Sequence, residues 1–182
     1  MDTIFAHSYE CERLNETQGS ALPHYYFPGA STQGGRDGIL VKVRPEHGQT
    51  WIGTFAFGDS GVSGIFTTPD PQRLCIVSNG EGYFVNTSIP TEWEAIRAMP
   101  IKDVRSILAQ EIIVFADYTD LVAYGRTGVK WKTERLVLDE LKITEVTDIS
   151  IKGEGWNPFD ETRKNFIVDA ATGRHEGAIK EF

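Results

Sequence analysis

Hydrophobic and polar side chains alternate along several segments of the chain, with the period of two that is typical of β-strands. In the first of these segments, Ile39, Val41 and Val43 fall on one face of an extended backbone, and Lys42 and Arg44 fall on the other. Because successive side chains of a strand point to opposite sides of a sheet, this segment is predicted to be a strand with one buried face.

Later segments repeat this pattern, and one of them is apolar at every position. The alternating ones are marked by Trp51, Phe55 and Phe57, by Val129, Trp131 and Thr133, and by Phe166 and Val168. Ile112–Ala116 is hydrophobic on both faces, which predicts a central strand that is covered on both sides. The indole of Trp131 is expected in the core.

Short stretches rich in Gly, Asn and Asp separate these segments, as tight turns require. The segments 54–66, 74–87, 112–125 and 141–153 each have the pattern strand, short turn, strand. Their spacing is irregular, which favours a meander of hairpins over a protein built from a repeat of fixed length.

One segment has the pattern of a helix instead. Between Pro90 and Pro100, Thr91 stands where a helix cap is expected, and Trp93 and Ile96 are spaced as on one helical face. A short helix is therefore predicted here, at one end or edge of the sheets.

Together these elements predict an all-β fold: an antiparallel meander of hairpins that forms a sandwich or barrel, with a propeller-like open meander as the alternative and with one short helix. Residues 1–37 include a stretch rich in Gly, Ser and Pro without periodicity, so an irregular N-terminal segment is expected, with Tyr25–Phe27 docked on the domain. Residues 38–182 are expected to form a single β-rich domain. A chain of 182 residues buries about 70% of its surface on folding, which is enough for an ordinary core.

The charge of the chain narrows the classes of partner. Its 18 Lys and Arg residues against 26 Asp and Glu give a net charge of −8, spread along the sequence without a basic cluster. Nucleic acids and anionic membranes attract clustered positive charge, so neither is expected as a partner. A basic protein partner is compatible with such a surface.

The sequence carries no pattern of a membrane or secreted protein. No apolar stretch approaches the roughly 18 residues of a transmembrane helix, and residues 1–20 lack the features of a secretory signal, so a cytoplasmic location is expected. Cys11 and Cys75 are expected to be ordinary reduced thiols.

The familiar catalytic and cofactor-binding patterns are missing from the sequence. Gly58–Gly61 has the Gly-Asp-Ser-Gly order of a serine-protease nucleophile loop, but no histidine in a matching context precedes it, and a hairpin turn is expected there. The four histidines lack a zinc-binding spacing, and no glycine-rich phosphate loop follows a strand, so neither a metal nor a cofactor is expected.

The candidate binding site lies in the segment Gly153–Asp160, which combines large aromatic residues with the Gly, Asn and Pro of an exposed loop. Trp156 and Phe159, together with Asp160 and Arg163, can form a recognition surface for a ring, a sugar face or a peptide. The two aromatic side chains can instead fold back as a lid on the core, and the residues alone leave both alternatives open.

Several short motifs in the second half of the chain carry a resemblance. They are Gly125-Arg-Thr-Gly128, Trp131, Arg135-Leu136, Asp139, Gly153-Glu-Gly-Trp156, Val168-Asp169 and Thr172-Gly-Arg174. With them, the region Ile113–Gly177 resembles a family of uncharacterised bacterial all-β proteins, a resemblance that covers about a third of the chain and implies no activity. The spacing of Gly and Trp also looks like a blade of quinoprotein or WD-type propellers, although Glu140 stands where a turn glycine would be expected.

Three functions fit these observations. The first is a non-catalytic cytoplasmic binding or protein-interaction domain, in a specific version an acidic antagonist of a basic partner. The second is a hydrolase-type enzyme whose site assembles only in the fold, with at least two of five side chains meeting in a deep pocket: Asp117, Asp120, Glu145, Asp148 and His175. The third is a structural subunit of a larger assembly, with uncovered edge strands or a large apolar patch.

Overall fold

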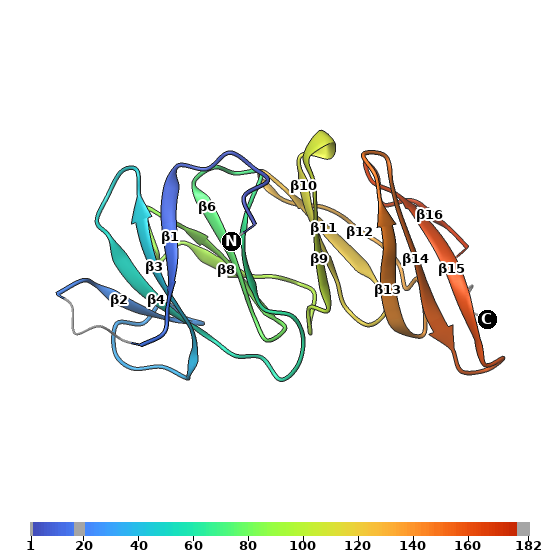
Figure 1. Cartoon of the computed structure of the whole chain (residues 1–182), viewed down its shortest axis with the longest axis horizontal. Helices are drawn as coiled ribbons and strands as arrows, with labels where there is room; N and C mark the ends of the chain where they lie inside the picture. The colour runs from blue at the N-terminus through green and yellow to red at the C-terminus, as the bar shows by residue number, and fades with distance from the viewer. Residues whose placement is uncertain (1, 17–20, 178–182) are drawn as a thin grey trace. The chain divides into compact units, whose positions relative to one another are not determined.

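The computed structural model describes residues 2–16 and 21–177, and the regular structure of these residues is β-strand apart from one short 3₁₀ helix. The chain divides into two compact units, residues 1–99 (unit 1) and 100–182 (unit 2). Figure 1 shows unit 1 from blue to light green and unit 2 from there to red. Each unit contains two four-stranded sheets, so the predicted all-β meander is confirmed.

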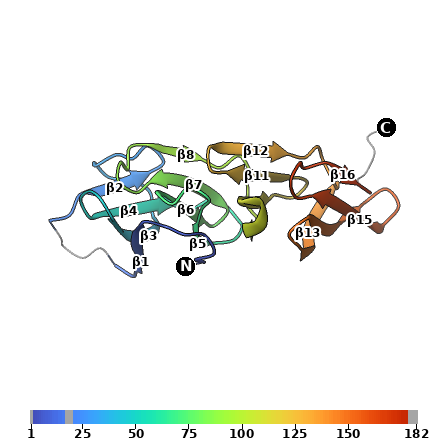
Figure 2. The same cartoon turned by 90° about the horizontal axis from the view of Figure 1, so that it is seen from above.

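The first sheet of unit 1 (the β1–β4 sheet) includes two pairs of strands that are not consecutive in the sequence. Its order is β1 (Tyr9–Leu14), β3 (Gly38–Pro45), β4 (Trp51–Ala56) and β2 (His24–Phe27). β2 runs parallel to β4, beside which it lies in Figure 2, and the other pairs are antiparallel. The second sheet (the β5–β8 sheet) is a meander of β5 (Gly64–Thr67), β6 (Arg73–Ser78), β7 (Glu81–Asn86) and β8 (Trp93–Ala95).

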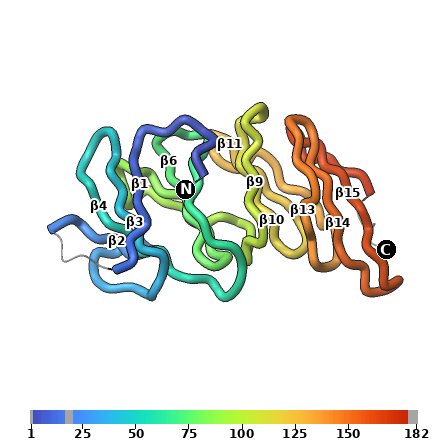
Figure 3. The backbone as a smooth tube through the Cα atoms, viewed as in Figure 1, coloured from blue at the N-terminus to red at the C-terminus, as the bar shows by residue number. Residues whose placement is uncertain are grey.

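Both sheets of unit 2 are meanders of consecutive strands, which the tube of Figure 3 follows in order. The β9–β12 sheet consists of β9 (Asp103–Ile107), β10 (Ile112–Ala116), β11 (Leu121–Gly125) and β12 (Gly128–Lys132). The 3₁₀ helix Leu108–Gln110 joins its first two strands. The β13–β16 sheet consists of β13 (Asp139–Val146), β14 (Ser150–Asn157), β15 (Thr162–Asp169) and β16 (His175–Glu176).

Within each unit, the two sheets share one hydrophobic core, which is the arrangement of a sandwich. In unit 1, Val41 and Phe55 of the first sheet pack in one cluster with Ile76 and Tyr83 of the second. In unit 2, a second cluster joins the β9–β12 sheet to the β13–β16 sheet, with Trp131 among its buried members, as predicted. Each of the four sheets is open, with two edge strands, so the sandwich form of the predicted fold fits.

The N-terminal 37 residues differ from the expected irregular segment. They contain β1 and β2, and the backbone N–H of Asp2 donates to the carbonyl of Ile65 at 2.9 Å. Tyr25 and Phe27 dock on the core as predicted. These strands form because β3 and β4 supply their backbone partners, which no local pattern reveals. Residues 17–20 of the predicted irregular segment lie outside the described part of the chain.

Three of the four predicted hairpins are confirmed, as β6–β7, β10–β11 and β13–β14. The turn between β6 and β7 has positive φ at both Asn79 and Gly80, as a type I′ turn requires. The hairpin predicted over 54–66 is wrong, because β4 and β5 belong to different sheets. The intervening loop bonds to the β6–β7 turn instead, with Gly58 N donating to Ser78 O at 2.9 Å.

The helix predicted between Pro90 and Pro100 is also wrong. The segment forms β8, in which Trp93 lies opposite Val85 and the ring of Trp93 meets that of Phe27 edge-on at 5.9 Å. A helix of this length has only marginal stability by itself. As a strand, the segment instead pairs with the edge of β7, and the indole of Trp93 packs against the core.

Two further expectations concern membranes and thiols. None of the helices in residues 2–16 and 21–177 has the length and hydrophobicity needed to cross a bilayer. Cys11 and Cys75 form no disulfide, and burial raises the pKa of the Cys11 thiol to about 11.

Candidate functional site

The four residues of the sequence-predicted site come together at one end of the β14–β15 hairpin. Trp156 of β14 lies opposite Arg163 of β15, and Phe159 and Asp160 lie in the loop between these strands. We call residues 156–163 the hairpin tip; it is the lower right end of the β13–β16 sheet in Figure 1.

Phe159 is the most exposed large hydrophobic residue of the described chain, with 80% of its surface accessible. Trp156 is half-buried and lies outside the buried cluster of unit 2. The predicted alternative in which these rings form a lid on the core is therefore wrong for Phe159. Its ring faces solvent because Pro158 and the following turn carry the chain beyond the end of the sheet.

Hydrogen bonds between side chains and residues two positions along the chain fix the backbone of the hairpin tip. Asn157 Oδ1 accepts from the N–H of Phe159 at 3.1 Å. Asp160 Oδ1 accepts from the N–H of Thr162 at 3.2 Å and from its hydroxyl at 2.7 Å. Such turns hold a loop in one conformation. The exposed ring of Phe159 is thus presented on an ordered backbone.

Ion pairs surround this ordered backbone. Arg163 contacts Glu140 at 2.7 Å and Glu154 at 3.6 Å, and Lys164 contacts Asp160 at 2.5 Å. The hydrogen bond from Lys164 is the main reason that the pKa of Asp160 lies below its ordinary value, and Thr162 adds to the effect. All of these side chains are at least partly open to solvent, so each pair contributes little to stability, and together they order the charges around Phe159.

Of the five side chains of the enzyme hypothesis, Asp117 and Asp120 lie at one turn and the other three lie elsewhere in unit 2. Asp117 and Asp120 flank the β10–β11 turn, where Asp117 Oδ1 accepts from the N–H groups of Thr119 and Asp120 at 2.7 and 2.9 Å. Burial raises the pKa of Asp120, and the neighbouring Asp117 adds to this shift. Asp117 thus serves its own turn, as aspartates commonly do.

Glu145 and His175 stand far apart in the second sheet of unit 2. They belong to β13 and β16, which are the opposite edge strands of that sheet, and Glu145 pairs with Lys152 at 3.0 Å. Asp148 precedes β14, and its backbone carbonyl accepts from the Gln110 amide at 2.9 Å. Among the described residues, no group of three or more His, Cys, Asp or Glu side chains is placed to hold a metal ion.

A pocket in unit 1 is the site that sequence analysis missed. It has a volume of about 500 Å³ and lies on the face of the β1–β4 sheet that points away from the core. We call it the His24 pocket. Its lining residues come from the end of β1, from β2, β3 and β4, and from the loop before β3: Asn15, Glu16, His24, Tyr26, Gly34, Gly35, Arg36, Asp37, Gly38, Leu40, Thr54 and Phe57.

The wall of the His24 pocket is aromatic. The rings of His24 and Tyr26 stack at 4.3 Å, because residues two apart in a strand lie on the same face. His24 Nε2 lies 2.8 Å from the hydroxyl of Thr54 on the neighbouring strand. Burial lowers the pKa of His24, so its ring is neutral at pH 7.

The loop before β3 forms the other side of the pocket. Gly35 lies so close to the ring of Tyr26 that a Cβ there would come within 2.5 Å of it, and Phe57 N donates to Asp37 O at 3.1 Å. The sequence could have indicated His24 and Tyr26, because two rings at alternate positions lie on the same face of a strand. Their neighbours across the sheet could not be found, because β2 pairs directly with β4, in parallel, although β3 lies between them in the sequence.

The comparisons with known proteins leave the family of the chain open. No protein-family model matches it, and a search of curated proteins found no match. The resemblance to uncharacterised bacterial all-β proteins stays a prediction.

Proposed function

We propose that the chain is a cytoplasmic binding protein that attaches to a basic protein partner through the hairpin tip. The observation that carries this proposal is the side chain of Phe159, 80% exposed on a backbone that its own turn fixes. Single exposed hydrophobic residues are common on protein surfaces, so exposure alone would mean little. An exposed ring on an ordered loop, however, is the form of an interface anchor, because little entropy is lost when it is buried.

The charges around the ring favour a basic partner. Four carboxylates, those of Glu140, Glu154, Asp160 and Glu161, stand beside two cations, Arg163 and Lys164. A negative rim around an apolar anchor attracts a positive surface and raises the rate of encounter. The net charge of −8 acts in the same direction over a longer range.

A photo-cross-linking amino acid in place of Phe159 tests the proposal in the cells that make the protein. Ile149 is the matched control position, because it is 72% exposed in the turn between β13 and β14, at the opposite end of the same sheet. We expect position 159, and not position 149, to cross-link to a protein of high isoelectric point. Equal cross-linking from both positions, or none from position 159, would contradict the proposal.

Binding of the purified partner then measures the contribution of the ring. Phe159→Ala is expected to weaken binding about tenfold to a hundredfold, as a buried anchor would, and Ile149→Ala is expected to leave it unchanged. Affinity is also expected to fall as salt rises from low to physiological concentration. An affinity that is independent of salt would remove the basic partner from the proposal, and an unaffected Phe159→Ala would remove the hairpin tip.

A further inference from the structure

The His24 pocket has the size and composition of a small-molecule site. Its volume of about 500 Å³ lies within the range of roughly 300–1,000 Å³ that ligand pockets occupy. It combines ring faces with a few polar and charged groups, which is the usual composition of such sites. It lies in unit 1, and none of its lining residues belongs to the hairpin tip, which is part of unit 2.

Rings and carboxylates determine the kind of ligand. The faces of aromatic rings are electron-rich. Phe57 is 46% exposed, which is unusual for so hydrophobic a side chain, whereas the ring of Tyr26 is stacked on His24 and touches Gly35. Glu16 and Asp37 bring two negative charges, and Arg36 brings one positive charge. The pocket therefore carries an excess of negative charge beside aromatic faces, a combination that attracts cations.

The charged residues that line the His24 pocket argue against an anionic ligand. Phosphate and carboxylate ligands are held by clustered arginines, lysines or helix N-termini, whereas Arg36 is the one cationic side chain among the residues that line this pocket. The neutral state of His24 at pH 7 adds no second cation. A phosphate placed here would face two carboxylates.

We propose that the His24 pocket binds a small organic amine, with its apolar body against the exposed ring of Phe57 beside the His24–Tyr26 stack and its ammonium group near Glu16 and Asp37. Stacking of His24 on Tyr26 and packing of Gly35 against the ring keep the aromatic wall in place before the ligand arrives. Such preorganisation lowers the cost of binding.

The test uses three molecules of similar size that differ in charge: phenethylamine, a cation; phenylalanine, a zwitterion; and phenylpropionate, an anion. Each is titrated into the isotope-labelled full chain at neutral pH, and the amide NMR signals of Gly34, Gly35 and Gly38 report on the pocket. We expect saturable binding of phenethylamine with a Kd of about 1 mM or lower, and binding of the other two at least about tenfold weaker.

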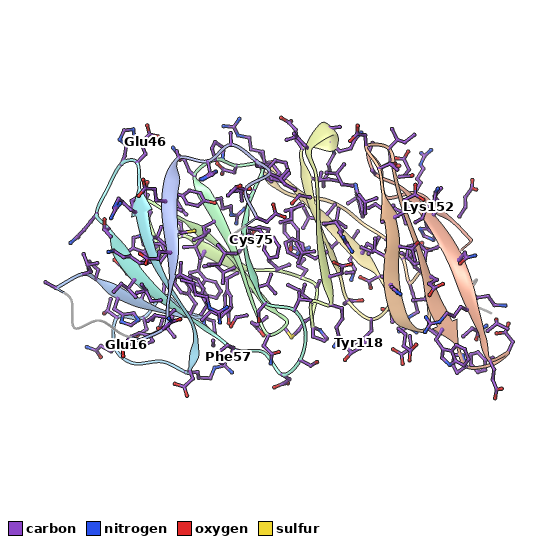
Figure 4. All side chains as sticks on the ribbon, viewed as in Figure 1. Glu16, Glu46, Phe57, Cys75, Tyr118 and Lys152 are labelled. Carbon is purple, nitrogen blue, oxygen red and sulfur yellow. The ribbon has the colours of Figure 1, made fainter. Side chains whose placement is uncertain are left out.

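Charge variants assign the binding to this pocket. Glu16→Gln and Asp37→Asn are each expected to weaken the binding of phenethylamine about two- to fivefold, and Arg36→Gln is expected to strengthen it by a similar factor. All three side chains are exposed, so the substitutions leave the fold intact. Glu46→Gln is the control, because Glu46 is an exposed acid of the same unit at the opposite end from Glu16 and Phe57 in Figure 4, and no change is expected.

Several results would overturn the proposal. They are glycine signals that do not saturate, binding of phenylalanine or phenylpropionate as tight as that of phenethylamine, and equal effects of Glu46→Gln and Asp37→Asn. Tighter binding of a neutral sugar such as glucose would also overturn it.

Discussion

The two units build their cores from different side chains. In unit 1 the buried cluster is rich in rings: Tyr9, Phe27, Trp51, Phe55 and Tyr83. In unit 2 the cluster is mainly Ile, Val, Leu and Ala, with Trp131 and Phe166 as its aromatic members. Sheets of the same strand number can therefore be joined either by a few large rings or by many smaller aliphatic groups.

The rings of unit 1 bring polar atoms into the core, and the backbone satisfies them. Phe27 stacks on Phe55 at 4.5 Å. Trp51 Nε1 donates to the carbonyl of Thr87 at 2.7 Å, and the Tyr83 hydroxyl donates to that of Ala56 at 3.1 Å. Each of these two hydrogen bonds fixes the orientation of a ring and gives its buried polar atom a partner.

The aliphatic core of unit 2 also requires close approach of the backbone at two glycines of β14. A Cβ on Gly155 of β14 would lie 2.3 Å from Cβ of Val137, and one on Gly153 would lie 2.2 Å from the ring of Phe166. Glycine leaves the room for these side chains. Glycine leaves room in unit 1 as well, where a Cβ on Gly53 would lie 2.7 Å from the ring of Phe55. The two units therefore differ in the side chains that fill their cores, and not in their need for glycine.

Removing a ring from unit 1 is expected to have the largest effect. Trp51→Ala should lower the free energy of unfolding by about 3–5 kcal/mol, because it empties a buried site and leaves the Thr87 carbonyl without its donor. Chemical denaturation followed by circular dichroism measures the change. Phe159→Ala is the control, with an expected change within about 0.5 kcal/mol. A loss for Trp51→Ala as small as the control would contradict this account of unit 1.

Adding one methyl group to unit 2 is expected to have an intermediate effect. Gly155→Ala should lower the free energy of unfolding by about 1–3 kcal/mol, because the new Cβ overlaps Val137. The double variant with Val137→Ala tests the cause, since removal of the overlapping group should recover part of the loss. Additive losses in the double variant would show that the overlap is not the source.

The smallest expected effect is the dependence of unit 1 on pH through His24. Burial holds the pKa of His24 in the folded chain below its ordinary value, so the unfolded chain binds the proton first as pH falls. This contribution to stability is present above about pH 6.5 and is lost as pH falls from there through the folded pKa. His24→Gln should therefore reduce the fall in Tm between pH 7.5 and pH 5. An identical fall in the variant would assign the dependence to other groups.

Local patterns predicted the parts of the fold that are local. The Asn79–Gly80 turn and the buried strand Ile112–Ala116 follow from residue types and periodicity, and both are confirmed. The strand β8 did not follow, because its partner β7 and the core site of Trp93 decide its conformation. The pattern of one segment cannot show whether it forms a helix or a strand when its contacts with another segment decide between the two.

The same distinction applies to the candidate sites. The hairpin tip is one continuous segment, so the sequence pointed to all four of its residues, and the exposure of Phe159 was one of the two alternatives left open. The His24 pocket gathers residues from four separate stretches of unit 1. Only the parallel pairing of β2 with β4 brings His24 beside Thr54, and the sequence gives no sign of that pairing.

The strand order of the β1–β4 sheet has a consequence for synthesis of the chain. As the N-terminus leaves the ribosome first, β2 has no neighbour until β4 has emerged, some 25 residues later. Every strand pair of unit 2 joins consecutive strands, so its hairpins can close as they appear. Because contacts between distant residues slow folding, β2 stays without a strand partner, and open to chaperones and other nascent chains, for longer than any strand of unit 2.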